Sequence, residues 1–83
     1  MNSFVALKFP VYIKYPNGKS LFKVTSYERF QEIKITGQIR ELHYFQAKIH
    51  PDRILIQDML ELKGGHWIES SAEEFELEKE KVK

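Results

Sequence analysis

His43 and Asp58 are the residues whose types and spacing most suggest chemistry in this 83-residue chain. A carboxylate beside an imidazole can fix the tautomer of the ring and raise its pKa, which prepares the ring for proton transfer. A tight turn at Pro51-Asp52 would make the two residues diagonal neighbours on an otherwise apolar sheet face. The alternative is a satisfied structural pair, or a bulge that turns Asp58 to water. Because the sequence holds no catalytic motif, we expect a protein that is not an enzyme.

The basic and aromatic side of the first expected hairpin could bind nucleic acid. Residues 1–27 contain four lysines and no acidic residue. Lysines can neutralise phosphates while an exposed ring stacks on a base, as in β-sheets that bind single strands. The alternative is a solvated face whose lysines protect a sheet edge from aggregation. The candidate residues are Lys8, Tyr12, Lys14, Lys19 and Lys23.

Trp67 is a candidate for protein binding. It follows Gly64-Gly65, so it either anchors in the core a hairpin that pairs the segments before and after this glycine turn, or stays exposed as an interface aromatic. A metal site is not expected, because the chain has no Cys and because His43 and His50 would point to opposite faces of their strand. We also expect no cofactor, since no phosphate-cradling glycine loop is present.

Two hairpins are expected to position these candidates. Asn17-Gly18 is the dipeptide preferred by a two-residue type I′ turn, and its register places Val11 opposite Val24 and Ile13 opposite Phe22. A second hairpin would turn at "HPDR" and pair the strand ending at Ile49 with the segment "ILIQDMLEL". A last short strand, "HWIES", would follow the glycine turn.

The phrase "TSYERF" at 25–30 returns as "SSAEEF" at 70–75. Both fit a helix capping box, in Thr25 with Glu28 and in Ser70 with Glu73. The first predicts a helix that ends near Gly37, and the second predicts a C-terminal helix. We expect only the first turn of that second helix to dock, with 76–83 as a frayed or flexible tail.

The sequence therefore predicts one α+β domain over 1–83, with a mainly antiparallel five-stranded sheet, the order ββα-β-ββα and two short helices. Its charge is uneven. Residues 1–53 hold nine Lys/Arg and four acidic residues, whereas 54–83 hold four and eight.

The segments "KYPNGKS", "FKVTSYERFQEI" and "LIQDMLELKGGHWIE" make most of the chain resemble short uncharacterised proteins of Bacteroides-type gut bacteria. The resemblance implies a cytoplasmic bacterial origin and transfers no catalytic or binding residue. The N-terminus lacks signal-peptide features and no apolar run approaches ~18 residues, so we expect a cytoplasmic protein with no membrane partner.

The leading expectation is a small non-enzymatic interaction module with an unknown protein partner, as a monomer or a homodimer. Nucleic-acid binding through the first hairpin is the alternative, and an enzyme that uses His43 and Asp58 is the third class.

Overall fold

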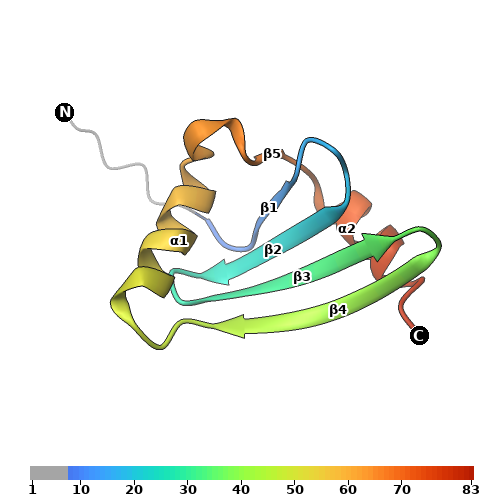
Figure 1. Ribbon diagram of the computed structural model, residues 1–83, viewed down its shortest axis with the longest axis horizontal. Coiled ribbons are helices and arrows are strands. Elements are labelled where there is room, and N and C mark those ends of the chain that lie inside the picture. Colours follow the sequence, from blue (N-terminus) through green and yellow to red (C-terminus); the bar gives the residue numbers. More distant parts are fainter. Residues whose placement is uncertain (1–7) are drawn as a thin grey trace.

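A computed structural model describes residues 8–83 of the chain and shows an α+β fold (Figure 1). Five strands form one antiparallel sheet in the order β4-β3-β2-β1-β5, and two helices pack on it. The predicted fold class is therefore confirmed. In chain order the elements are β1 (Val11–Lys14), β2 (Ser20–Ser26), β3 (Arg29–Thr36), β4 (Ile39–Gln46), α1 (His50–Leu60), the 3-10 turn η1 (Lys63–Gly65), β5 (Ile68–Glu69) and α2 (Ala72–Lys79).

The register of the first hairpin is as predicted, with Val11 opposite Val24 and Ile13 opposite Phe22. Its turn is of a different kind. The N–H of Gly18 donates to the Tyr15 carbonyl at 2.9 Å, so Pro16 and Asn17 occupy the centre of the turn. Gly18 has a φ of +75°, but Asn17 does not have the positive φ that a type I′ turn needs. Proline at the first central position selects this wider loop, which keeps the same strand pairing.

The helix predicted after "TSYERF" is wrong, because residues 29–36 form strand β3. The phrase itself makes the turn between β2 and β3, where the Ser26 hydroxyl accepts the N–H of Glu28 at 3.1 Å. The residues that follow decide the outcome. In "RFQEIKIT", Phe30 and Ile33 face opposite sides of the sheet, and the β-branched Ile33 and Ile35 suit a pleated strand.

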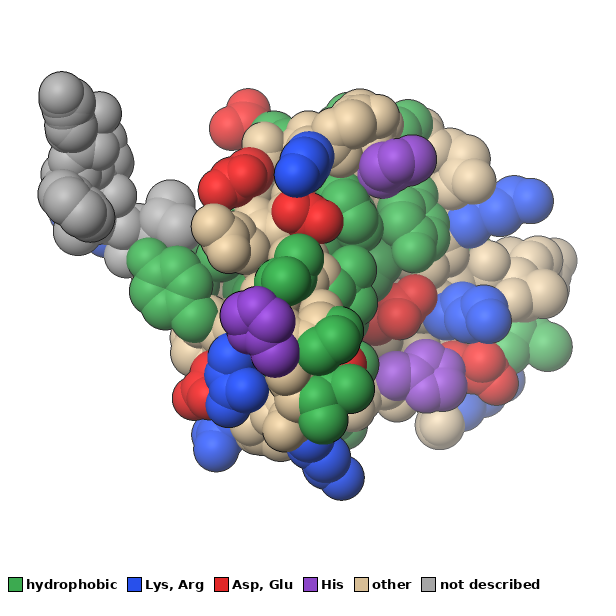
Figure 2. Space-filling model, turned by 60° about the vertical axis from the view of Figure 1, so that its left-hand side comes forward, with side chains coloured by type: hydrophobic (Ala, Val, Ile, Leu, Met, Phe, Trp, Pro, Cys, Tyr) green, Lys and Arg blue, Asp and Glu red, His purple; other side chains and the backbone are tan. Residues whose placement is uncertain are grey.

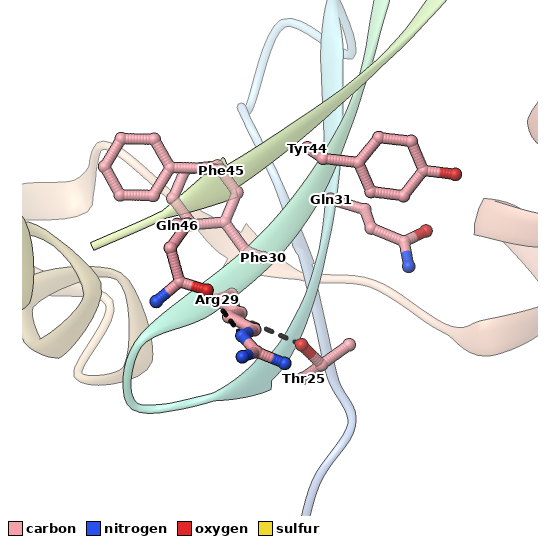
Figure 3. A pocket seen from close by; sticks show the side chains of 7 residues that line it. All are labelled: Thr25, Arg29, Phe30, Gln31, Tyr44, Phe45 and Gln46. Carbon is pink, nitrogen blue, oxygen red and sulfur yellow. Dashed lines mark hydrogen bonds between the residues drawn. The ribbon is translucent and has the colours of Figure 1, made fainter. Parts of the chain in front are cut away.

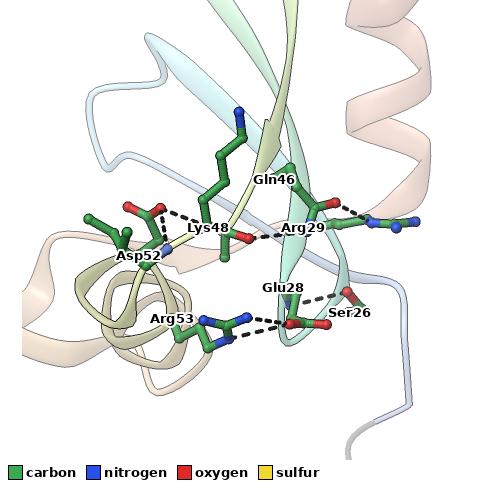
Figure 4. Close-up of polar contacts among 9 residues, drawn as sticks. Ser26, Glu28, Arg29, Gln46, Lys48, Asp52 and Arg53 are labelled. Carbon is green, nitrogen blue, oxygen red and sulfur yellow. Dashed lines mark hydrogen bonds and ion pairs between the residues drawn. The ribbon is translucent and has the colours of Figure 1, made fainter.

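The strand predicted over "ILIQDMLEL" is also wrong, because His50–Leu60 is helix α1. Pro51 lies in its first turn, where the missing N–H removes no helical hydrogen bond. The Asp52 carboxylate accepts the N–H groups of Lys48 and Ile49 at 2.9 and 3.3 Å and so caps the helix (Figure 4). The same residues that suit a tight turn thus start a helix, and the second predicted hairpin does not exist.

Helix α1 is held to the β2–β3 turn by polar contacts, which Figure 4 shows from close by. The Arg53 guanidinium donates to the Glu28 carboxylate at 2.8 Å, and the N–H of Ala47 donates to the Glu28 carbonyl at 2.8 Å. These bonds fix the start of α1 beside the end of the sheet.

The two helices cover opposite faces of the sheet. On one side, here called the α1 face, Ile56 and Met59 of α1 pack with four strand residues and Ala47, namely Ile13, Phe22, Val24 and Phe30. On the other side, the α2 face, the fully buried Phe75 packs with Leu21 and Ile33. The predicted apolar side of the first hairpin is therefore covered by α1, the segment that was predicted to be a strand.

The predicted C-terminal helix is present as α2, with a cap one residue later than expected. The Ser71 hydroxyl accepts the N–H of Glu74 at 3.1 Å, while the Ser70 hydroxyl donates to the Glu74 carboxylate at 2.6 Å. The predicted short strand is present as β5. It pairs with β1 rather than with the segment before the glycine turn, and it places Ile68 opposite Lys14.

Helix α2 docks beyond its first turn, which corrects the expectation of a single docked turn. The guanidinium of Arg40 on β4 donates to the Glu78 carboxylate at 2.8 Å, and both side chains are only 16% exposed. Val82 packs against the cluster around Phe75. The predicted fraying of 76–83 concerns motion and stays a prediction.

Candidate functional site

The His43–Asp58 pair loses its structural basis. His43 lies on β4 opposite Glu32, and its Nε2 atom is 3.6 Å from the Glu41 carboxylate. Asp58 lies on α1, 3.8 Å from the Lys63 ammonium. The segment that would have made Asp58 a diagonal neighbour of His43 is helix α1, so the two residues do not share a hairpin.

The predicted nucleic-acid face is partly occupied by α2. The Lys14 ammonium donates to the Glu74 carboxylate at 2.7 Å, and the ring of Tyr12 lies 5.9 Å from the ring of Phe75. Lys8 and Lys19 are exposed and Lys23 is half-buried. The acidic helix α2 therefore lies on the same face as Tyr12 and Lys14, where it lowers the attraction of phosphates.

Trp67 is half-buried and packs against the hydrophobic cluster of the α1 face. Its ring centroid is 6.5 Å from that of Tyr15, and the two residues line an open hollow with His66. The indole N–H is buried and meets no acceptor among residues 8–83. Trp67 therefore packs against the core while part of its side chain stays at the surface, and its role in protein binding stays a prediction.

The described part of the chain contains no group of three His, Asp or Glu residues arranged to hold a metal ion. No helix within residues 8–83 is both long and apolar enough to cross a bilayer.

The α1 face changes from apolar to polar along its strands. Beyond α1, Glu32 and Lys34 of β3 lie opposite His43 and Glu41 of β4, and the buried Ser20 hydroxyl donates to Glu32 at 2.7 Å. Figure 2 shows hydrophobic side chains in the middle of this side and a mixed group of basic, acidic and histidine side chains toward its right. This half of the face has no covering helix among the described elements.

Tyr15 borders this polar half. Burial raises the pKa of its phenol, and the negative charge of Glu32 raises it further. Both effects favour the neutral phenol, so Tyr15 contributes an uncharged aromatic side chain to this part of the face around pH 7.

The outer side of β4 is the most distinctive surface of the fold. β4 is eight residues long and ends the sheet, and Figure 1 shows no described strand or helix beyond it. Because Ala47 donates inward to Glu28, the alternation of an antiparallel ladder turns the N–H and C=O groups of Arg40, Leu42 and Tyr44 outward. A row of backbone donors and acceptors therefore faces away from the sheet.

Exposed apolar side chains flank this edge. On β4 itself, Ile39 is 62% and Tyr44 73% exposed, and Ile49, just after the strand, is 59% exposed. Ile54 and Leu55 of α1 are exposed as well, at 44% and 37%. An edge flanked in this way is unusual, since charged side chains, prolines or bulges usually protect an edge strand.

A hollow of about 310 Å³ adjoins the edge (Figure 3). Tyr44 and Gln31 point to one side of the sheet there, while Phe45 and Phe30 point to the other and stack at 4.6 Å. The Gln31 side-chain carbonyl is buried and meets no donor within residues 8–83. Such a carbonyl is ready to accept a hydrogen bond from a bound group.

No family model, no curated protein and no solved structure matches this chain. The resemblance to short proteins of gut bacteria stays a prediction.

Proposed function

We propose that this protein is a small non-enzymatic protein-binding module that takes up an extended segment of its partner along β4. The observation that carries the proposal is the open outer side of this eight-residue strand, where Arg40, Leu42 and Tyr44 present unpaired backbone groups. An extended peptide can add itself to such an edge as a further strand, with affinity from main-chain hydrogen bonds.

Side chains around β4 supply selectivity. On the α2 face, a partner side chain can enter the hollow beside Tyr44 and meet the carbonyl of Gln31. On the α1 face, Phe45 and Ile39 offer apolar contacts at the two ends of the strand, with Glu41 and His43 between them. Alternate residues of the bound segment would therefore face different surroundings, which is how strand addition distinguishes one sequence from another.

The usual obstacles to strand addition are few on β4, where Glu41 is the exposed acidic side chain. Its one arginine, Arg40, is neutralised by Glu78 and folded against α2. The strand contains no lysine and no proline, the residues that commonly block an edge. Its length exceeds the typical ~5–6 residues of a strand, so a partner can form several hydrogen bonds.

A selection from a random peptide library against the immobilised chain tests the proposal. Selected peptides are titrated into the ¹⁵N-labelled protein, and we expect amide shifts and slowed hydrogen exchange at Arg40, Leu42 and Tyr44. The variant Tyr44→Pro removes one outward N–H and should weaken binding about tenfold or more, while its control Tyr44→Val keeps that N–H.

Before binding, the inward amides of Glu41, His43 and Phe45 should already be protected in both variants. That pattern shows that the β3–β4 pairing survives the substitution. Peptides that shift only Tyr15 and Trp67, or that bind Tyr44→Pro as well as wild type, would overturn the proposal of an edge site, as would a selection that yields no binder.

A further inference from the structure

We infer that the partner of the β4 edge is a second copy of this chain, paired antiparallel about Leu42. The inference rests on the proposed function, because it uses the same outward backbone groups. Two five-stranded sheets would then join across a twofold axis into one continuous sheet.

The backbone restricts the register of such a pair. Outward groups must face outward groups, so Arg40, Leu42 and Tyr44 of one copy have to lie opposite even-numbered residues of the other. Antiparallel pairings centred on residues 41, 42 and 43 meet this condition. If the pairing of the two β4 strands shifts by one residue, inward-facing backbone groups lie opposite the open edge. The hydrogen bonds between the two copies are then lost.

Charge selects among the three registers. A pairing centred on Glu41 places Glu41 against its own copy, and a pairing centred on His43 places His43 against its own copy. The pairing centred on Leu42 instead places Glu41 opposite His43 of the second copy, and it does so twice because of the symmetry. It also forms about six backbone hydrogen bonds through Arg40, Leu42 and Tyr44.

The same register matches the apolar residues. Ile39, which is 62% exposed, comes to lie opposite Phe45 of the second copy on the α1 face. On the α2 face, Arg40 lies opposite Tyr44 of the second copy, whose exposed ring can cover the guanidinium. Leu42 lies opposite Leu42 of the second copy. Each exposed apolar side chain of the strand thus gains a partner.

The neighbouring strand continues the pattern. Within one chain, Glu32 lies opposite His43 and Lys34 lies opposite Glu41. Across the dimer, four side chains therefore form one row on the α1 face. Their order is Glu32 and His43 of one copy, then Glu41 and Lys34 of the second copy. Acidic and basic side chains alternate along the whole row, which favours this pairing over one with clustered charges.

Sedimentation of the wild-type chain from low to high micromolar concentration is the first test. We expect a mass that rises toward twice the 9.9 kDa of one chain. In a mixture of labelled and unlabelled protein, a filtered NOE experiment should show contacts between the Ile39 methyl groups and the Phe45 ring. Within one strand these residues are six positions, or roughly 20 Å, apart, so the contact can only be intermolecular.

Charge variants test independently that the two copies pair through β4. His43→Glu makes positions 41 and 43 both acidic, and the double variant Glu41→Lys with His43→Lys makes both basic. Each alone should dimerise about tenfold more weakly than wild type, and an equimolar mixture should regain association. Far-UV circular dichroism of each variant tests whether its fold is retained.

A wild-type chain that stays monomeric at high micromolar concentration overturns the dimer. If selected peptides still shift Arg40, Leu42 and Tyr44 in that monomer, the proposed function survives without it. A dimer that lacks the Ile39–Phe45 contact overturns the Leu42-centred register. A variant mixture that stays monomeric overturns the pairing of the two copies through β4.

Discussion

The ammonium group of Lys14 lies 2.7 Å from the carboxylate of Glu74, which joins the first hairpin to helix α2. The Ser70 hydroxyl donates to the same carboxylate at 2.6 Å. Residues 60 positions apart in the chain are thus held together by a charged hydrogen bond at the edge of the α2 face. This contact neutralises one of the lysines that could have met a phosphate and brings an acidic helix onto the same side.

Single-stranded nucleic acid should therefore bind only weakly, in contrast to the alternative function that the sequence leaves open. We expect labelled oligonucleotides to show little anisotropy change at about 50 mM salt, because Tyr12 and Lys14 are engaged with α2. The variant Glu74→Gln removes the charge that holds Lys14 and should bind more tightly than wild type. Tight wild-type binding that falls steeply toward about 200 mM salt would restore nucleic acid as the partner.

Acid should weaken the attachment of α2. Hydrogen bonds from Lys14 and Ser70 lower the pKa of Glu74 below its ordinary value of 4.5, so the folded state favours the carboxylate. The resulting stabilisation is present above the unfolded pKa and is lost as the pH falls through the folded pKa. Because the Glu74 side chain is 39% exposed, screening should keep its contribution below about 1 kcal/mol.

Urea denaturation of Glu74→Gln between neutral and acidic pH measures this effect. The variant should be less stable than wild type at neutral pH, and the difference should shrink on acidification. Glu76→Gln is the matched control, since it removes the same charge from an exposed position of α2. A Glu74→Gln deficit that is independent of pH would show that the carboxylate is not responsible.

Phe75 should carry most of the packing energy of α2, because it is fully buried against Leu21 and Ile33. We expect Phe75→Ala to lower the free energy of unfolding by about 3–5 kcal/mol, measured by urea denaturation. Leu77→Ala, at a position that is 56% exposed, should change it by less than about 0.5 kcal/mol.

The milder variant Phe75→Leu keeps the test informative if Phe75→Ala does not fold. Its loss should lie between the losses of Phe75→Ala and Leu77→Ala. Equal losses at positions 75 and 77 would contradict the docking of α2 on the sheet.

Local patterns predicted the first hairpin well. The alternation of Val11, Ile13, Phe22 and Val24 has one register that places all four on one face, and Gly18 supplies the positive φ that the loop needs. The predicted type I′ turn was wrong, because Pro16 changes the loop without changing the pairing of the two strands.

The repeated phrase "TSYERF" and "SSAEEF" shows where local patterns fail. Hydroxyl side chains accept a nearby N–H in both, from Glu28 in a strand-to-strand turn and from Glu74 at a helix start. A capping signal satisfies the backbone equally well in either setting. The residues that follow decide, since "EIKIT" suits a sheet and "ELEKEK" suits a helix.

The sequence did not predict the open outer edge of β4, for a related reason. Pro51-Asp52 fits both a tight turn and the first turn of a helix, and the segment after it is apolar with either period. As the second strand of a hairpin, that segment would pair with β4 and close its outer edge. As helix α1, the same segment leaves β4 as an edge strand of the sheet. One ambiguous dipeptide therefore separates a closed edge from an open one.

The central strand β2 makes the molecule sensitive to changes in length. Its neighbouring residues Leu21 and Phe22 belong to the hydrophobic clusters under α2 and α1, respectively. Inserting or deleting one residue there would turn Phe22 to the α2 face and Leu21 to the α1 face, so the packing on both faces would be disrupted at once. An insertion or deletion in β2 should therefore disturb the fold more than the exchange of one of its side chains for another of similar size.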